Sequence, residues 1–198
     1  MTDPEVVEWY NKGSEYYEKG KRVKALECYD KALDIDPRDR MSLFNKGVTL
    51  TDLGRLHEAL ACFDELIKEE PDNAMALQGK GTILSVMGKY DEALELLDKA
   101  LEKDEKLYSI WFEKGLALYE LDRHDEAIAA LDKVLENEPE HIDALVYKGI
   151  VLATAGKQLE AIQSYMKVIA IAKKRGDKDL LKRMATYLPD EESMDDSK

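Results

Sequence analysis

The sequence repeats itself with a fixed period of 34 residues, and this period constrains the fold more than any other feature. A tryptophan, a glycine, tyrosines, alanines and a proline stand at fixed places in the first unit, and steps of 34 carry the same kinds of residue forward. The predicted units are 6–39, 40–73, 74–107, 108–141 and 142–175, joined without an inserted or deleted residue. A period of this size predicts stacked supersecondary units in place of a single globular core.

Each unit contains two segments in which apolar or small residues recur at helical spacing. In the first unit these residues are Trp9, Gly13 and Tyr16 in one segment and Ala25, Tyr29 and Ala32 in the other. A glycine between the segments suits the left-handed residue that ends a helix, and Asp122 takes its place in the fourth unit. Glycine inside a helix costs ~1 kcal/mol relative to alanine. Gly13 and its equivalents are therefore predicted to let the two helices approach closely, each opposite an alanine such as Ala25.

The residue set identifies the repeat. Trp9, Gly13, Tyr16, Ala25, Tyr29, Ala32 and Pro37 occupy the places that define the pattern. The sequence from 6 to 175 thereby resembles the tetratricopeptide repeat, and the residues of its units are similar to those of repeats from methanogenic archaea. The resemblance implies an all-α fold, a right-handed superhelix of five helix-turn-helix units with a capping helix. It also implies that the first helices line a concave face that binds peptides or helices.

The two ends of the chain and one internal junction depart from the repeat. Residues 1–5 are predicted to start the first helix, with Asp3 as its cap. Residues 176–188 carry an apolar stripe and are predicted to form the capping helix, while 189–198 are acidic and are predicted to be a disordered tail. A solubilising tail is favoured over a docking peptide. The third unit ends without a proline, which predicts a softer or longer junction with the fourth unit.

Composition excludes several classes of protein. The formal charge of −13 and the pI near 4.8 argue against a nucleic-acid partner, because such binding depends on neutralising phosphates. No apolar run approaches the ~18 residues of a membrane span, and the first residues lack the pattern of a signal peptide. Cys28 and Cys62 stand 34 apart, too far across packed helices for a disulfide. Two free thiols predict a cytoplasmic protein.

The sequence offers no catalytic or cofactor-binding constellation. His57, His124 and His141 fall at three different places in the repeat, so they form neither a metal site nor a nucleophile–base pair. No phosphate-binding loop is present. We therefore expect neither an enzyme, nor a cofactor, nor a metal site.

A helical wheel at 100° per residue divides each first helix into a side that faces its partner helix and an opposite side that faces the groove. The predicted partner-binding residues are Val7, Tyr10, Ser14, Tyr17, Met41, Phe44, Asn45, Val48, Met75, Gln78, Thr82, Phe112, Leu116, Tyr119, Val146 and Ile150. Thr51, Ser85, Ser109, Asp143 and Ala153 lie on the same side of the wheel. Two explanations stay open for this apolar face: packing between neighbouring first helices, or a groove for an apolar peptide or amphipathic helix.

The charges around the groove give two further predictions. Glu18, Asp52 and Glu120 on its margin favour a partner with lysine or arginine. A second row, Lys12, Lys46, Lys80, Lys114 and Lys148, repeats with the units. We favour lysine stems lying along the seam between helices over a charged ladder for an acidic ligand.

The function predicted from the sequence is an adaptor that binds a protein segment in the groove. Two alternatives are a structural role through self-assembly and a receptor for a short free peptide. Chaperone-binding members of the family hold a terminal carboxylate with lysine, asparagine and arginine side chains. Only Asn45 matches that set, so carboxylate clamping is disfavoured.

Overall fold

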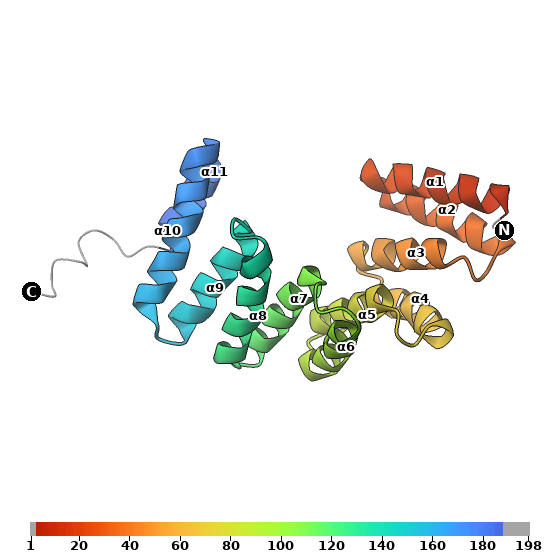
Figure 1. Ribbon diagram of the computed structural model, residues 1–198. Coiled ribbons are helices and arrows are strands. Elements are labelled where there is room, and N and C mark those ends of the chain that lie inside the picture. Colours follow the sequence, from red (N-terminus) through yellow and green to blue (C-terminus); the bar gives the residue numbers. More distant parts are fainter. Residues whose placement is uncertain (1–2, 188–198) are drawn as a thin grey trace, which may run out of the picture. The chain divides into compact units, whose positions relative to one another are not determined.

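The computed structural model describes residues 3–187, and over this range the chain is all-helical, with eleven helices and no strand (Figure 1). The chain divides into two compact units, 1–106 and 107–198. The helices of the first unit are α1 (Pro4–Glu18), α2 (Arg22–Ile35), α3 (Arg40–Asp52), α4 (Leu56–Glu69), α5 (Ala74–Val86) and α6 (Tyr90–Lys103). The helices of the second unit are α7 (Tyr108–Glu120), α8 (His124–Asn137), α9 (Ile142–Thr154), α10 (Gln158–Arg175) and α11 (Lys178–Ala185). The predicted all-α fold class is confirmed.

The 34-residue period appears directly in the helix boundaries. The helices α3, α5, α7 and α9 begin at residues 40, 74, 108 and 142, and α4, α6, α8 and α10 begin at 56, 90, 124 and 158. In each compact unit, consecutive helices pack as antiparallel pairs, and the second helix of a pair also packs on the first helix of the next pair. Each compact unit is therefore a stack of helical hairpins. The predicted boundaries of the five sequence units stay a prediction.

The turn inside each pair has the predicted left-handed residue. The backbone φ angle is 71° at Gly20, 71° at Gly54, 75° at Gly88 and 78° at Gly156. Asp122 takes the same conformation, with φ of 56°, because a short polar side chain tolerates this region better than most. The amide of the next residue donates back into the helix, as Lys21 N does to Tyr16 O over 2.9 Å. The amide of the left-handed residue also donates back, as Gly20 N does to Tyr17 O over 2.9 Å. These two hydrogen bonds satisfy two helix carbonyls at each turn.

The helices of a pair do approach closely at the helical glycines, but the main contact is not the predicted alanine. A methyl group built on Gly13 would lie 2.6 Å from Tyr29 Cε1, and one on Gly149 would lie 2.2 Å from Tyr165 Cε1. At Gly81 the alanine contributes only a carbonyl oxygen, at 3.5 Å. The glycine makes room for the large side chain one turn beyond the alanine, and the prediction is corrected accordingly.

The helix α7 lacks the side-chain N-cap that α3, α5 and α9 have. Asp39, Asn73 and His141 each precede a first helix, and their side chains accept a hydrogen bond from its third amide at 2.9, 3.0 and 3.2 Å. Leu107 occupies the equivalent place before α7 and makes no side-chain cap. The junction that lacks a proline also lacks this cap, and it coincides with the division between the two compact units.

A short helix covers part of the last pair, where a capping helix was expected. Gly176 ends α10 in the left-handed region, and the Asp177 side chain caps α11 through Leu180 N at 2.9 Å. Leu180 and Met184 are buried at 5% and 0% exposure in the same core cluster as α10. The predicted tail, 189–198, lies outside the described residues.

Candidate functional site

Three neighbouring hollows lie along α1, α3 and α5, and Phe44 lines all of them. The first, of about 310 Å³, is lined by Tyr10, Ser14, Tyr17, Glu18, Tyr29, Phe44, Asn45 and Val48. The second, of about 280 Å³, is lined by Phe44, Val48, Thr51, Asp52, Phe63, Met75, Gln78, Gly79 and Thr82. The third, of about 250 Å³, is lined by Arg40, Met41, Phe44, Asn45, Leu66, Asn73 and Met75. Together we call these residues the first-unit groove.

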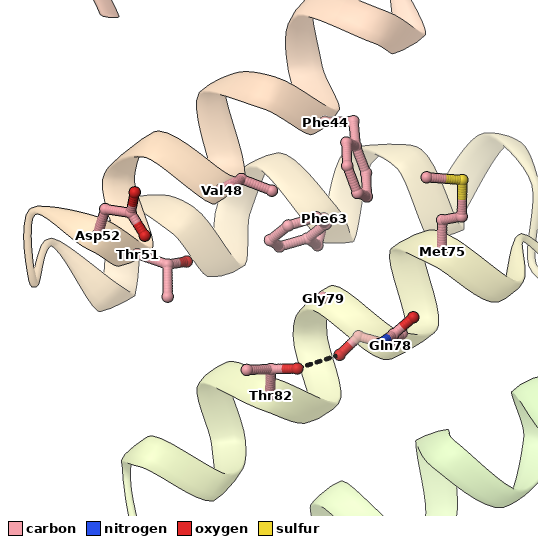
Figure 2. A pocket seen from close by; sticks show the side chains of 9 residues that line it. All are labelled: Phe44, Val48, Thr51, Asp52, Phe63, Met75, Gln78, Gly79 and Thr82. Atoms are coloured by element: carbon pink, nitrogen blue, oxygen red, sulfur yellow. Dashed lines mark hydrogen bonds between the residues drawn. The ribbon is translucent and has the colours of Figure 1, made fainter. Parts of the chain in front are cut away.

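The second hollow, which we call the Phe63 pocket, has an aromatic floor. Figure 2 shows the Phe63 ring between α3 and the turn of α5 that carries Gly79. Phe63 is 1% exposed, and the ring of Phe44 meets it edge-on with centroids 5.7 Å apart. On the opposite rim Met75 is 58% exposed. The pocket is therefore an apolar hollow with a rigid floor and one adaptable thioether side chain.

Gly79 makes the Phe63 pocket possible. A methyl group at Gly79 would lie 2.4 Å from Phe63 Cε1, closer than real side chains approach. The equivalent places in the other helix pairs carry larger residues, namely Asn11, Asn45, Glu113 and Tyr147. The glycine is thus a local departure from the repeat, and it lets the Phe63 ring lie directly against the α5 backbone at the floor of the pocket.

The first hollow is more polar than the Phe63 pocket. The ring of Tyr10 lies 6.3 Å from that of Tyr29, whose hydroxyl donates to Ser14 Oγ at 3.4 Å. Burial raises the pKa of Tyr29 above its ordinary value. Tyr29 therefore stays a neutral hydrogen-bonding group at the end of this hollow.

An ion pair compensates the carboxylate on the groove margin. Arg22 Nε donates to Asp52 Oδ2 at 2.6 Å, and the Arg22 guanidinium lies 3.9 Å from the centre of the Tyr17 ring. Burial, together with the hydrogen bond and charge of Asp52, raises the pKa of Tyr17. Asp52 therefore does not present a free charge to a ligand. Glu18 lines the first hollow, and its role toward a basic partner stays a prediction.

The lysine row joins helix pairs. Lys46 Nζ lies 2.6 Å from Asp30 Oδ1, Lys80 Nζ lies 2.6 Å from Asp64 Oδ1, and Lys148 Nζ lies 2.5 Å from Asp132 Oδ1. Each aspartate belongs to the second helix of the preceding pair. Lys12 instead lies over the ring of Trp9, 4.8 Å from its centre. Lys46, Lys80 and Lys148 thus lie along the seams between helix pairs, and their aspartate partners also recur with the 34-residue period.

The structure brings most of the predicted groove residues of the first compact unit together. Eleven of them line the three hollows, namely Tyr10, Ser14, Tyr17, Met41, Phe44, Asn45, Val48, Thr51, Met75, Gln78 and Thr82. Val7 is 43% exposed but lines none of the three. The wheel treated the first helices alone, and so it missed the floor residues Tyr29 and Phe63 from the second helices. Large rings at equivalent places in successive units were the available signal.

The predicted groove residues of the second compact unit are more dispersed. Phe112 contacts His141 and Tyr147, with ring centroids 5.5 and 5.7 Å apart, and Tyr119 lies 6.3 Å from His124. Leu116 is half-buried, and Ile150 packs on the core. Val146 is 6% exposed and belongs to the core cluster, so we correct its assignment to a ligand-binding surface.

The two cysteines and one histidine, His141, have structural places. Cys28 and Cys62 are free and buried, and burial raises the pKa of both thiols. His141 Nδ1 accepts the Ala144 amide as a cap. Within residues 3–187, no group of three or more histidine, cysteine or carboxylate side chains is placed to hold a metal ion. In the same part of the chain, no helix is both long and apolar enough to cross a bilayer.

Comparison with known proteins gives one family and a set of similar folds. Sequence models described as tetratricopeptide repeat match residues 6–39, 49–108, 79–140 and 112–176. A comparison with curated proteins finds no match. Among solved structures, MamA 41-end from Desulfovibrio magneticus RS-1 is 21% identical, with a TM-score of 0.77, covering 90% of this chain and 99% of its own.

Two further solved structures give the same result. A MamA RS-1 double mutant is 21% identical, with a TM-score of 0.77, covering 88% of this chain and 98% of its own. TTC0263, a thermophilic repeat protein of Thermus thermophilus, is 22% identical, with a TM-score of 0.76, covering 92% and 98%. These identities establish a shared fold, and the similarity to archaeal repeats stays a prediction.

Proposed function

The chain belongs to the tetratricopeptide repeat family, whose members generally mediate contacts between proteins, and we propose that it is an adaptor whose first-unit groove binds a partner segment. The family is a scaffold family, in general without enzymatic activity. The proposed ligand is an extended or helical segment with at least one bulky apolar side chain, inserted into the Phe63 pocket.

The observation that carries the proposal is the Phe63 pocket itself. Its volume of about 280 Å³ lies just below the about 300–1,000 Å³ of small-molecule sites, and it suits a single large side chain. Met41 and Met75, 56% and 58% exposed, flank Phe44 along the groove. Exposed methionines adapt to different apolar surfaces. An anchor side chain with apolar neighbours matches this arrangement.

The polar rim favours a ligand that donates hydrogen bonds. Thr51 Oγ1 donates to Gly47 O at 2.9 Å, and Thr82 Oγ1 donates to Gln78 O at 3.0 Å. With their protons used inside the helix, both hydroxyls offer lone pairs to the pocket. The protein has a formal charge of −13, and Glu18 lies at the rim of the groove. A partner with basic residues around its apolar anchor fits these acceptors.

The outer side of α1 argues against self-assembly by head-to-tail stacking. Glu8 and Glu15 are exposed there. The later helix pairs carry at these two positions Ser42, Ala76, Ile110 and Ala144, and Thr49, Ile83, Ala117 and Val151, all at most 1% exposed. The first pair thus presents charge where a preceding repeat would need a buried contact. We also place the protein in the cytoplasm, because its two cysteines are unpaired.

The test is a selection from a library of displayed peptides, followed by affinity measurement with two variants. Met75→Glu places a charge on the rim of the Phe63 pocket. Val86→Glu is the matched control, since Val86 lies on the same helix, is 63% exposed and lines none of the three hollows. We expect Met75→Glu to weaken binding at least about tenfold, equivalent to about 1.4 kcal/mol, while Val86→Glu binds as the unmodified protein does.

Unchanged binding by Met75→Glu would reject the groove as the binding site. The receptor alternative is separated by testing the selected sequence both as a free short peptide and within a folded protein. A ligand bound only as a free peptide would favour the receptor over the adaptor.

A further inference from the structure

The first hollow of the groove is bounded by aromatic side chains. Four rings from three helices line it, namely Tyr10 and Tyr17 of α1, Tyr29 of α2 and Phe44 of α3. The Tyr29 side chain is buried, and the other three are half-buried. The rings of Tyr10 and Tyr29 have centroids 6.3 Å apart and are inclined to each other by 42°. The hollow, of about 310 Å³, is therefore a space between rings.

The first helix pair is alone in having a ring at each of the repeat positions that Tyr10, Tyr17 and Tyr29 occupy. Every later pair has a residue without a ring at one or more of them. These residues are Thr51, Gln78, Ser85, Leu97, Leu131, Val146 and Ala153. Since the later pairs form the same helices without the full set of rings, helix packing alone does not demand three of them.

The charge that faces this hollow is negative. Among the described residues that line it, Glu18 is the one charged side chain, and it is exposed. Within residues 3–187 Glu18 forms no ion pair. The neighbouring cations Lys19 and Arg22 are held by Glu15 and Asp52. A ligand that enters the hollow would therefore meet an uncompensated carboxylate at its rim.

The rings themselves attract positive charge. The face of an aromatic ring attracts a cation that lies within about 6 Å of its centre, and the Arg22 guanidinium already lies 3.9 Å from the centre of the Tyr17 ring. The centroids of Tyr10 and Tyr29 are 6.3 Å apart. A single cation between these two rings can therefore lie within reach of both.

The inclination of the rings favours an ammonium over a guanidinium. A guanidinium is planar and stacks flat on one ring, so it cannot lie parallel to both Tyr10 and Tyr29, whose planes differ by 42°. An ammonium is a compact point charge, and it can approach both rings whatever their inclination. Methyl groups on the nitrogen keep the charge and add apolar surface, which an aromatic cage accepts.

We propose that the first hollow is a cage for an ammonium group, the end of a lysine side chain with or without methyl groups. The rings of Tyr10 and Tyr29 attract the cation, and Glu18 supplies the opposite charge. Phe44 and Val48 line both this hollow and the Phe63 pocket. The inference rests on the proposed function in that a partner segment occupies the groove, and such a segment then carries a lysine next to its apolar anchor.

The test uses three small probes with the full-length protein. They are acetyl-lysine methylamide, its form with a trimethylated side-chain nitrogen, and a neutral isostere with a tert-butyl group in place of trimethylammonium. Titrations follow the amide signals of α1 and α3, and upfield shifts of the probe methyl signals report rings around them. We expect the trimethylated probe to bind at least as tightly as the lysine probe, because attraction by rings needs no N–H donor. The isostere should bind at least about tenfold more weakly, equivalent to about 1.4 kcal/mol.

The contribution of the carboxylate is tested by Glu18→Gln. We expect this variant to weaken the binding of both cationic probes at least about threefold, as the loss of one exposed ion pair does. Glu8→Gln is the matched control, because Glu8 lies on the same helix, is exposed and lines none of the three hollows. It changes the net charge by the same amount and should leave both affinities unchanged.

The contribution of the rings is tested by Tyr10→Leu, which we expect to weaken the binding of the trimethylated probe at least about tenfold, equivalent to about 1.4 kcal/mol. Tyr16→Leu is the matched control. Tyr16 lies on the same helix and lines none of the three hollows, and leucine stands at its position in the other four helix pairs. Circular dichroism confirms that both variants keep their helices.

Four results would overturn the proposal. One is the absence of binding by both cationic probes. Another is equal binding of the neutral isostere, which would make the hollow a purely apolar site. The third is loss of binding on trimethylation, which would assign the ammonium to Glu18 without the rings. The fourth is equal binding by Tyr10→Leu and Tyr16→Leu. The probes carry no apolar anchor, so these outcomes are independent of the Phe63 pocket, which Met75→Glu tests separately.

Discussion

Gly79 shows how a single missing side chain changes the local packing of a repeated fold. The ring of Phe63 faces two glycines, Gly47 within its own pair and Gly79 in the next. The first glycine recurs in every sequence unit and serves helix packing. The second occurs in the third sequence unit alone, where Asn45 or Tyr147 stands in others. Since helical glycine costs ~1 kcal/mol relative to alanine, its presence here is explained by the buried Phe63 ring, which packs directly against the α5 backbone at the floor of the pocket.

Replacement of Gly79 by alanine tests this interpretation. The new methyl group would lie 2.4 Å from the Phe63 ring, which is buried and cannot easily move. We expect overpacking to lower the free energy of unfolding by ~1–3 kcal/mol, measured by urea denaturation. Gly81→Ala on the same helix is the control, because its methyl would meet the end of Leu97 at 3.1 Å. Equal losses for the two variants would contradict a special role of position 79.

For Lys80 we predict only a small effect of substitution on stability. Its ion pair with Asp64 is partly exposed, with 29% and 55% of the two side chains accessible, and such pairs contribute ~0–1 kcal/mol. Lys80→Met should therefore cost less than about 1 kcal/mol and leave affinity for a selected peptide unchanged. A folded variant that has lost its ligand would show that the lysine row belongs to the binding surface.

At the scale of the helix, the sequence predicts the helices and turns better than it predicts the contacts between them. The turns and the covering helix after the last pair followed from spacing, because each depends on residues near one another in sequence. The all-helical fold followed from the resemblance to the tetratricopeptide repeat. The contact opposite Gly13 was misassigned to Ala25, since a wheel gives direction without the length of the side chain. Pairing of Asp52 with Arg22 joins different helix pairs, and no single-helix pattern contains it.

The α10 helix carries a prediction about alkaline pH. Burial raises the pKa of Tyr165 to about 12, whereas an unfolded tyrosine titrates near about 10. The folded state favours the neutral phenol, so its contribution is complete below about pH 10 and is lost as the pH rises through about 12. Tyr165→Phe should lose less stability than the unmodified protein across this range, measured by urea denaturation at several pH values.

Tyr16→Phe is the control for this experiment, because Tyr16 lies on α1, in the other compact unit from Tyr165, and is only half-buried. It should keep the alkaline slope of the unmodified protein. The same slope in Tyr165→Phe would show that other groups govern alkaline unfolding.

For the whole molecule, the division at residues 106 and 107 predicts how the chain unfolds. Stability in a repeat protein is approximately a sum of local terms and nearest-neighbour contacts. The junction before α7 has neither the side-chain cap nor the preceding proline found before α3, α5 and α9. The two tryptophans, Trp9 and Trp111, lie in different compact units. Each therefore reports on the unfolding of its own unit.

Leu77→Ala and Leu145→Ala form a matched pair for this test, since the two leucines occupy equivalent positions in the first and second compact units and are 0% and 2% exposed. Each substitution should cost ~2–5 kcal/mol, which at ~1–3 kcal/mol/M lowers the urea midpoint by roughly 1 M or more. We expect Leu77→Ala to move the Trp9 transition, followed in Trp111→Phe protein, more than the Trp111 transition, followed in Trp9→Phe protein. Leu145→Ala should do the reverse. If either substitution moved both transitions equally, the chain would unfold as one cooperative body, and the weak junction would have no thermodynamic consequence.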